Sequence, residues 1–414
     1  MMILFGLFTA LLLGYLIFHT IVAHASSLQK IGAAFLIGIA TESIFMFLLE
    51  CVNIEFTAIR LMLLSWTAII LLLVISPRPL IPPLPRSGRK SLNPVWTTFT
   101  VAVIFLVLAS TAKSLYWPTS AYDNVAGYDL IGKVMGHEGR IDNSLFDSNG
   151  EPMPGLGPRI QYPPLVSGSF AYAYLLGAES SKIITSLFFI SFTLLFYALL
   201  KKVIKPTGAM MITFLTLITP EFYAFTSLST TNIPTAIYVS IGMIYLALWM
   251  QDNKNSYLTL SGLFISFSVW ARSDSLVFAM VFILIVLVYA IRNKMFSPAY
   301  LSCLSVVLPF ALWTVFSWQH FQFENNVFSL AIDVEKFKTL MQLIWELVSI
   351  ADFFGITFYL LALALLFDLL QFKTFKPHPV LTLFCIAIIG FTLLYYFISA
   401  EKMNSSYTNI IAAS

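Results

Sequence analysis

Long apolar runs recur along most of the chain and limit its fold more than any other feature. Each is about 17 to 22 residues long, the length that a helix needs to cross a hydrocarbon layer about 30 Å thick. Only 10% of the 414 residues are charged and 59% are hydrophobic, whereas about a quarter of a soluble domain is charged. The sequence therefore predicts an all-α, polytopic transmembrane bundle.

We expect about 11 to 13 spans. They are placed at residues 1–22, 31–52, 57–76, 96–113, 181–200, 208–219, 232–250, 258–270, 275–291, 299–318, 354–370 and 379–398. Segments 208–219 and 258–270 are short for a crossing and would need tilt or protein-lined ends. Segments 162–176 and 335–350 look amphipathic and are expected to lie along the outer interface.

The basic residues predict the orientation, because short cytoplasmic loops retain an excess of Lys and Arg. Segment 77–95 holds four basic residues and no acid. Even numbers of predicted spans separate it from three further basic clusters, Lys201/Lys202/Lys205, Arg292/Lys294 and Lys373/Lys376. Segment 115–160 holds six acids and three bases. We therefore expect the basic loops to be cytoplasmic, and segment 115–160 and both termini to be extracytoplasmic.

The chain is expected to have three parts. Residues 1–76 form leading transmembrane helices, and the basic, proline-rich stretch 77–95 predicts a stiff cytoplasmic linker. Residues 96–414 form the main transmembrane module, with 115–160 as its outer loop.

A distinctive pattern of aromatic and charged residues occupies this outer loop. Tyr122-Asp123 follows the fourth predicted span, Tyr128 and Lys133 come next, and Tyr162-Pro163-Pro164-Leu165 precedes the following span. The pattern resembles the first extracytoplasmic loop of the GT-C glycosyltransferase superfamily, whose members use polyprenyl-phosphate-linked sugars. More narrowly, it is similar to bacterial relatives of protein mannosyltransferases and aminoarabinose transferases.

A second match lies at the predicted outer end of another span. Trp270-Ala-Arg272-Ser-Asp274-Ser-Leu-Val277 has the basic residue, small polar residue, acid and apolar run that many relatives carry there. The resemblance implies a GT-C-like fold and an inverting enzyme in a bacterial inner membrane, with an extracytoplasmic active site.

The chemistry of such a transfer assigns candidate roles. A base must take the proton of the acceptor hydroxyl, and cations must hold the departing phosphate. Asp123 is the candidate catalytic base. The candidate donor-phosphate ligands are Arg272, Arg159 and Lys133, and the candidate acceptor-side or supporting residues are Asp274, Asp129, Tyr128 and Tyr162.

Each assignment has a structural alternative. Asp123 could be only the N-cap of a helix over about 124–135. Asp129 and Lys133 are spaced for an i,i+4 ion pair. Arg159 could anchor lipid headgroups, and Arg272 could extend from a span end toward the interface.

Cofactors and partners follow from the same reading. The sequence indicates no particular cofactor; a divalent metal stays an open alternative, to which His137 and Glu138 could contribute. The three cysteines lack metal-ligand spacing. Expected partners are a polyprenyl-phosphate sugar, a glycan, lipid or protein acceptor, and membrane lipids, but no nucleic acid.

Two other classes fit the same composition. A secondary transporter also has about a dozen spans and a few intramembrane charges such as Glu42 and Glu50, although interhelical hydrogen bonds explain those acids more simply. A noncatalytic subunit of an envelope assembly complex is the third class, favoured if Asp123 is dispensable.

Overall fold

The computed structural model describes residues 2–22, 24–75, 93–118, 127–154, 156, 160–294, 296–322, 338–339, 341–342, 345–346, 349 and 354–370. The chain divides into two compact units, Met1–Phe323 and Glu324–Ser414. Within the described part, the only β pairing is an isolated bridge between Phe146 and Pro152. The predicted all-α class is confirmed.

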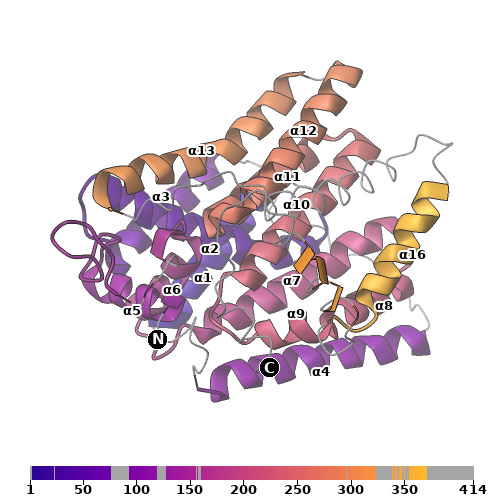
Figure 1. Ribbon diagram of the computed structural model, residues 1–414, viewed down its shortest axis with the longest axis horizontal. Helices are drawn as coiled ribbons and strands as arrows, with labels where there is room; N and C mark the ends of the chain where they lie inside the picture. The colour runs from indigo at the N-terminus through magenta and orange to yellow at the C-terminus, as the bar shows by residue number, and fades with distance from the viewer. Residues whose placement is uncertain are drawn as a thin grey trace. The chain divides into compact units, whose positions relative to one another are not determined.

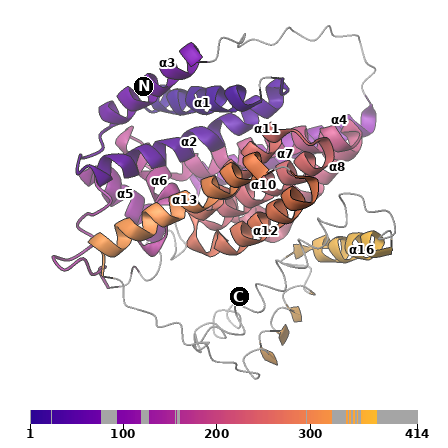
Figure 2. The same ribbon diagram turned by 90° about the horizontal axis from the view of Figure 1, so that it is seen from above.

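Helices make up most of the first unit (Figures 1 and 2). They are α1 (Met2–Ile21), α2 (Ser27–Cys51), α3 (Ala58–Ile75), α4 (Pro94–Tyr116), α5 (Asp129–Glu138), α6 (Leu165–Leu175), α7 (Lys182–Val203), α8 (Pro206–Leu217), α9 (Pro220–Phe225), α10 (Asn232–Asp252), α11 (Asn255–Ala271), the 3-10 helix η3 (Ser273–Ser275), α12 (Leu276–Asn293) and α13 (Phe296–His320). The second unit contains α16 (Thr357–Leu370).

Eight helices among the described residues are long and apolar enough to cross a membrane. The stretches lie in α1, α2, α3, α4, α7, α10, η3 with α12, and α13. This agrees with a multi-pass integral membrane protein. The predicted span 379–398 lies outside the described residues, as does nearly all of the predicted linker 77–95.

Local sequence sets several helix ends. Ser26 and Gln29 form a capping box at the start of α2, and Asn93 caps α4, whose first residue is Pro94. Gly139 ends α5 with a φ of 68°, a left-handed conformation that glycine adopts without a steric penalty.

The predicted short segments differ in their surroundings. The 17-residue α11 packs against α10 and α13 and is buried along most of its length. Protein therefore surrounds it, as expected for a short span. Segment 208–219 falls on α8, and α9 and the non-helical residues 226–231 continue the chain toward α10.

The prediction that 162–176 forms an amphipathic surface helix is wrong. Residues 165–173 of α6 are all buried, and α6 packs against α5 and α2. Its polar side chains find partners inside the protein: Ser169 Oγ donates to the Leu165 carbonyl over 2.5 Å, and Tyr172 Oη donates to the Gly6 carbonyl over 2.8 Å. The polar residues that suggested an amphipathic surface helix are satisfied internally. Most of segment 335–350 lies outside the described residues.

Helix ends that are far apart in sequence meet at one end of the bundle, here called the site end. Phe56 N donates to the Gly139 carbonyl over 2.8 Å, which joins the α2–α3 turn to the end of α5. Gln322 N donates to the Gly150 carbonyl over 2.9 Å, which joins the end of α13 to the loop after α5. The predicted order of spans also puts the α2–α3 turn, the loop after α5 and the end of α13 on the same side of the membrane.

Glu42 is the most deeply buried acid among the described residues. It is 0% exposed in α2, and its Oε1 accepts a 2.5 Å hydrogen bond from Ser65 Oγ of α3. The interhelical hydrogen bond expected for this acid is therefore present. Glu50, also in α2, accepts from Ile141 N over 2.7 Å and so ties the loop after α5 to α2.

We expect Ser65→Ala to lower the free energy of unfolding by about 1 to 3 kcal/mol, because it removes a partner from a buried carboxyl group. Thermal unfolding of the purified protein in detergent measures the change. Thr67→Ala is the matched control, since Thr67 is exposed on the same helix and its hydroxyl donates only to the Leu63 carbonyl. Equal stability of the two variants would contradict the expected role of the Ser65 hydroxyl.

Candidate functional site

Arg272 lies where the chain leaves α11 at the site end. Its extended backbone (φ −161°, ψ 124°) ends the helix, and η3 follows directly. The guanidinium is held by two residues: NH1 donates to Asn232 Oδ1 over 2.7 Å, and Nε donates to Asp274 Oδ2 over 2.8 Å. Because Asn232 begins α10, Arg272 links the start of α10 to the end of α11.

Two aromatic rings extend this cluster. The Cζ of Arg272 lies 5.3 Å from the ring centroid of Tyr162, within cation–π range. The rings of Tyr162 and Tyr128 are stacked, with centroids 6.3 Å apart and planes inclined by 16°. Thr231 Oγ1 donates to Tyr128 Oη over 3.4 Å. The structure thus brings together four predicted site residues, Arg272, Asp274, Tyr162 and Tyr128, which we call the Arg272 cluster.

The protonation states in this cluster follow from its surroundings. Burial opposes the charge of Arg272, but the neighbouring Tyr162 and Asp274 outweigh it, so the pKa of Arg272 lies above its ordinary value. Burial is also the main cause that raises the pKa of Tyr162. At neutral pH the cluster therefore offers a permanent cation and a protonated phenol, which suit the binding of an anion with hydrogen-bond acceptors.

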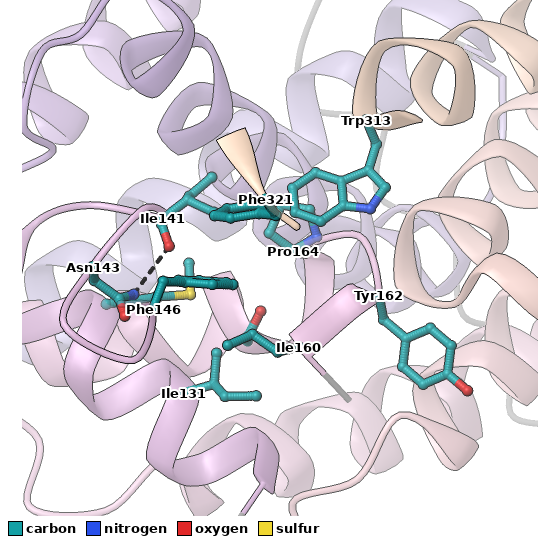
Figure 3. A pocket seen from close by; sticks show the side chains of 11 residues that line it. Ile131, Ile141, Asn143, Phe146, Ile160, Tyr162, Pro164, Trp313 and Phe321 are labelled. Carbon is teal, nitrogen blue, oxygen red and sulfur yellow. Dashed lines mark hydrogen bonds between the residues drawn. The ribbon is translucent and has the colours of Figure 1, made fainter. Parts of the chain in front are cut away.

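Tyr162 also forms part of the wall of an apolar pocket (Figure 3). The pocket is lined by Phe146, Trp313 and Phe321 among others, and its volume of about 10 Å³ holds roughly one water molecule. Figure 3 shows the Tyr162 hydroxyl pointing away from these rings, and Tyr162 Oη donates to Asp274 Oδ2 over 3.3 Å. Tyr162 therefore separates the apolar pocket from the polar cluster.

Asp129 makes different contacts from those that its sequence spacing suggests. Its Oδ1 accepts hydrogen bonds from Tyr174 Oη over 2.8 Å and from Ser181 Oγ over 2.5 Å. The alternative i,i+4 ion pair with Lys133 is not present; Lys133 is exposed, and neither residue makes a salt bridge in the described part of the chain. Asp129 thus joins α5 to the end of α6 and the start of α7.

Lys182 is a buried cation that the sequence reading did not select. It is 4% exposed at the start of α7, and its Nζ donates to the Trp117 carbonyl just after α4. Its neighbour Ser181 holds Asp129, as described above, and contacts Ser229 Oγ at 3.2 Å. A lysine at the second position of the predicted span 181–200 was the available signal. Asn232, at the first position of the span at 232–250, was missed in the same way.

Two predicted site residues, Asp123 and Arg159, lie outside the described residues. The exposed His137 is in the last turn of α5, and Glu138 accepts hydrogen bonds from the backbone and hydroxyl of Ser144. Among the residues that the structure describes, no group of three or more His, Cys, Asp or Glu side chains could hold a metal ion.

Comparisons of the chain with protein-family models, with curated proteins and with solved structures each found no match. The class of protein that can be stated is therefore the one that composition and helices define: a multi-pass, all-α membrane protein with a cationic and aromatic cluster at one end of its bundle.

Proposed function

We propose that this protein is an inverting membrane glycosyltransferase of GT-C type, which moves a sugar from a polyprenyl-phosphate-linked donor to an acceptor hydroxyl. One observation carries the proposal: the Arg272 guanidinium, held by Asn232 and lying over the ring of Tyr162, is at the end of the bundle where Thr231 contacts Tyr128, the residue before α5. A donor anchored in the membrane by its polyprenyl chain presents its phosphate near such a surface.

The proposed reaction is a single displacement at the anomeric carbon. The acceptor oxygen forms a bond to this carbon while the bond to the phosphate oxygen breaks on the opposite face, so the configuration inverts. Asp123 takes the acceptor proton, and polyprenyl phosphate leaves with the bonding electrons. Arg272 stabilises the charge that develops on the leaving phosphate.

The other candidate residues have unequal support. Tyr162 and Tyr128 stack beside Arg272 and offer an aromatic platform with hydroxyl groups for a sugar or phosphate. Lys133 is exposed on α5 and free to reach a ligand. The Oδ1 of Asp129 is already engaged by Tyr174 and Ser181, which favours a positioning role for this carboxylate.

The proposed setting is the inner membrane of a bacterium, with the Arg272 cluster on the extracytoplasmic side. The basic residues support this orientation, because Lys202, Lys254 and Arg292 belong to loops or helix ends at the opposite end of the bundle. A divalent metal is not part of the proposed mechanism, and neither is a nucleotide.

A secondary transporter is the second candidate, and one observation favours it. The chain is non-helical over 226–231, between α9 and α10, and the buried Thr230 Oγ1 has no hydrogen-bond partner among the described residues. Interrupted helices with free polar groups line substrate sites in many transporters. Such a protein would move a solute without releasing polyprenyl phosphate.

The decisive experiment measures release of polyprenyl phosphate by the purified full-length protein. Donors are polyprenyl-phosphate-linked hexoses, pentoses and aminopentoses, with membrane extract as the source of acceptors. We expect at least one polyprenyl donor to be consumed and a sugar mass to be added to an acceptor. Nucleotide-linked sugars serve as control donors and should not be consumed. Absence of release with every polyprenyl donor would contradict the proposal.

A further inference from the structure

The Asp274 carboxylate binds Arg272 through one oxygen only. Arg272 Nε donates to Asp274 Oδ2 over 2.8 Å, and Arg272 NH2 lies 2.8 Å from the same atom. Tyr162 Oη also donates to Oδ2, over 3.3 Å. The strongest guanidinium pairs instead join two nitrogens to two separate oxygens in parallel. Asp274 therefore occupies the donors of Arg272 without forming that geometry.

The ion pair is also open to solvent. The side chain of Asp274 is 57% exposed and that of Arg272 is 31% exposed. Ion pairs with such exposure contribute little net free energy, because water and salt screen them. A competing anion can therefore replace the carboxylate at a modest cost in free energy, which a ligand with further contacts can recover.

Arg272 does not depend on Asp274 alone for its position. Its NH1 donates to Asn232 Oδ1 over 2.7 Å, and its Cζ lies 5.3 Å from the centroid of the Tyr162 ring. Both contacts can persist when the carboxylate turns away. The guanidinium would then present Nε and NH2 side by side, an arrangement that matches two oxygens of a phosphate group.

We propose that Asp274 is a specificity-determining residue that competes with phosphate groups for Arg272, so that a phosphate binds there only by displacing the Asp274 carboxylate. The inference rests on the proposed function and adds a selection step to the same site. Phospholipid headgroups at a membrane surface carry phosphates in large excess over a sugar donor. A ligand that adds contacts to Asn232, Tyr162 or Tyr128 displaces the carboxylate, whereas a plain headgroup gains little by doing so.

The test uses the full-length protein without any sugar donor. Retention of phosphatidylglycerol from mixed phosphatidylcholine and phosphatidylglycerol nanodiscs is followed by native mass spectrometry. Binding of inorganic phosphate is followed by calorimetric titration. The variants are Asp274→Asn, Asp274→Ser and the double variant Asp274→Asn with Arg272→Ala. Asp142→Asn is the control, because Asp142 is an exposed acid of the same outer loop and is absent from the Arg272 cluster.

We expect Asp274→Asn and Asp274→Ser to bind the phosphate group about tenfold more tightly or better, since a like charge within a few ångströms is removed. The double variant should lose the gain, and Asp142→Asn should match the wild type. A gain with phosphatidylglycerol identifies lipid headgroups as the excluded anion, and a gain with inorganic phosphate identifies free phosphate; either supports the exchange. Unchanged or weaker binding in both arms would overturn it.

This outcome is separate from the fate of the proposed function. A gain in anion affinity without sugar transfer from any donor would support the competition between Asp274 and phosphate for Arg272 and contradict the proposed glycosyltransferase function. Sugar transfer that depends on Arg272, together with unchanged phosphate affinity in Asp274→Asn, would support the proposed enzyme and contradict the competition between Asp274 and phosphate.

Discussion

Replacing Asp123 with asparagine is expected to slow sugar transfer about 10²- to 10⁴-fold while the protein folds normally. A general base needs a carboxylate that can accept a proton, and an amide cannot do so. An N-cap needs only a short side chain with an oxygen acceptor, which asparagine also supplies, so a purely capping Asp123 would lose no more than a few tenths of a kcal/mol. The one substitution separates the two roles.

The measurement is the initial rate of polyprenyl phosphate release at saturating donor, alongside thermal unfolding in detergent. Asp142→Asn is the matched control, because Asp142 is another acid of the outer loop and is exposed. We expect both variants to unfold near the wild-type temperature, with only Asp123→Asn inactive. Wild-type turnover by Asp123→Asn would assign Asp123 to the cap and remove the central residue of the proposed mechanism.

Arg272→Ala is expected to lower kcat/KM for the donor about 10²- to 10³-fold, the effect of removing one preorganised group that stabilises charge in a transition state. Arg272→Lys should recover part of the activity, because an ammonium restores the charge but cannot form the bidentate contact. Arg140→Ala is a matched control: Arg140 NH1 donates to Asn53 Oδ1 over 2.7 Å, and its Nε lies 3.8 Å from Glu55 Oε1.

Donor concentration series give kcat and KM separately for these three variants. The order wild type, Arg272→Lys, Arg272→Ala in kcat/KM, with Arg140→Ala close to wild type, is the expected result. Equal losses of kcat/KM in Arg140→Ala and Arg272→Ala would indicate that both substitutions disturb the structure of the site end, and would contradict a specific role of Arg272 in donor binding. Transfer by Arg272→Ala at the wild-type rate would take Arg272 out of the site.

The four residues of the Arg272 cluster were selected from the sequence, whereas the neighbouring Asn232 and the buried Lys182 were not. Tyr162 and Arg272 are 110 positions apart, yet both were selected, because each lies in one of the two short patterns that resemble GT-C enzymes. Asn232 was not selected, because its importance depends on how α10 and α11 pair, and no local pattern reports that pairing. Lys182 was missed for the same reason, since its partner is a backbone carbonyl 65 residues earlier.

Two local interpretations failed because tertiary contacts were stronger. The i,i+4 spacing of Asp129 and Lys133 is compatible with an ion pair, but Ser181 and Tyr174 supply hydroxyl donors to the carboxylate instead. Segment 162–176 looks amphipathic in sequence, although α6 is enclosed by neighbouring helices. The periodicity of polar residues shows which positions of a helix are polar. It does not show whether those positions face water or a hydrogen-bond partner inside the protein.

The contacts between α13 and the loop after α5 determine when the site end can be completed during synthesis. Trp313 Nε1 donates to the Gln161 carbonyl over 3.0 Å across a separation of 152 residues. At translation rates of about 5 to 20 residues per second, the loop therefore waits roughly 8 to 30 s for this partner. During that interval Phe146 of this loop also lacks Phe321, the ring on which it stacks with centroids 4.0 Å apart. Slow insertion of α13 would consequently reduce the yield of the whole site end, even though α13 contributes no residue to the Arg272 cluster.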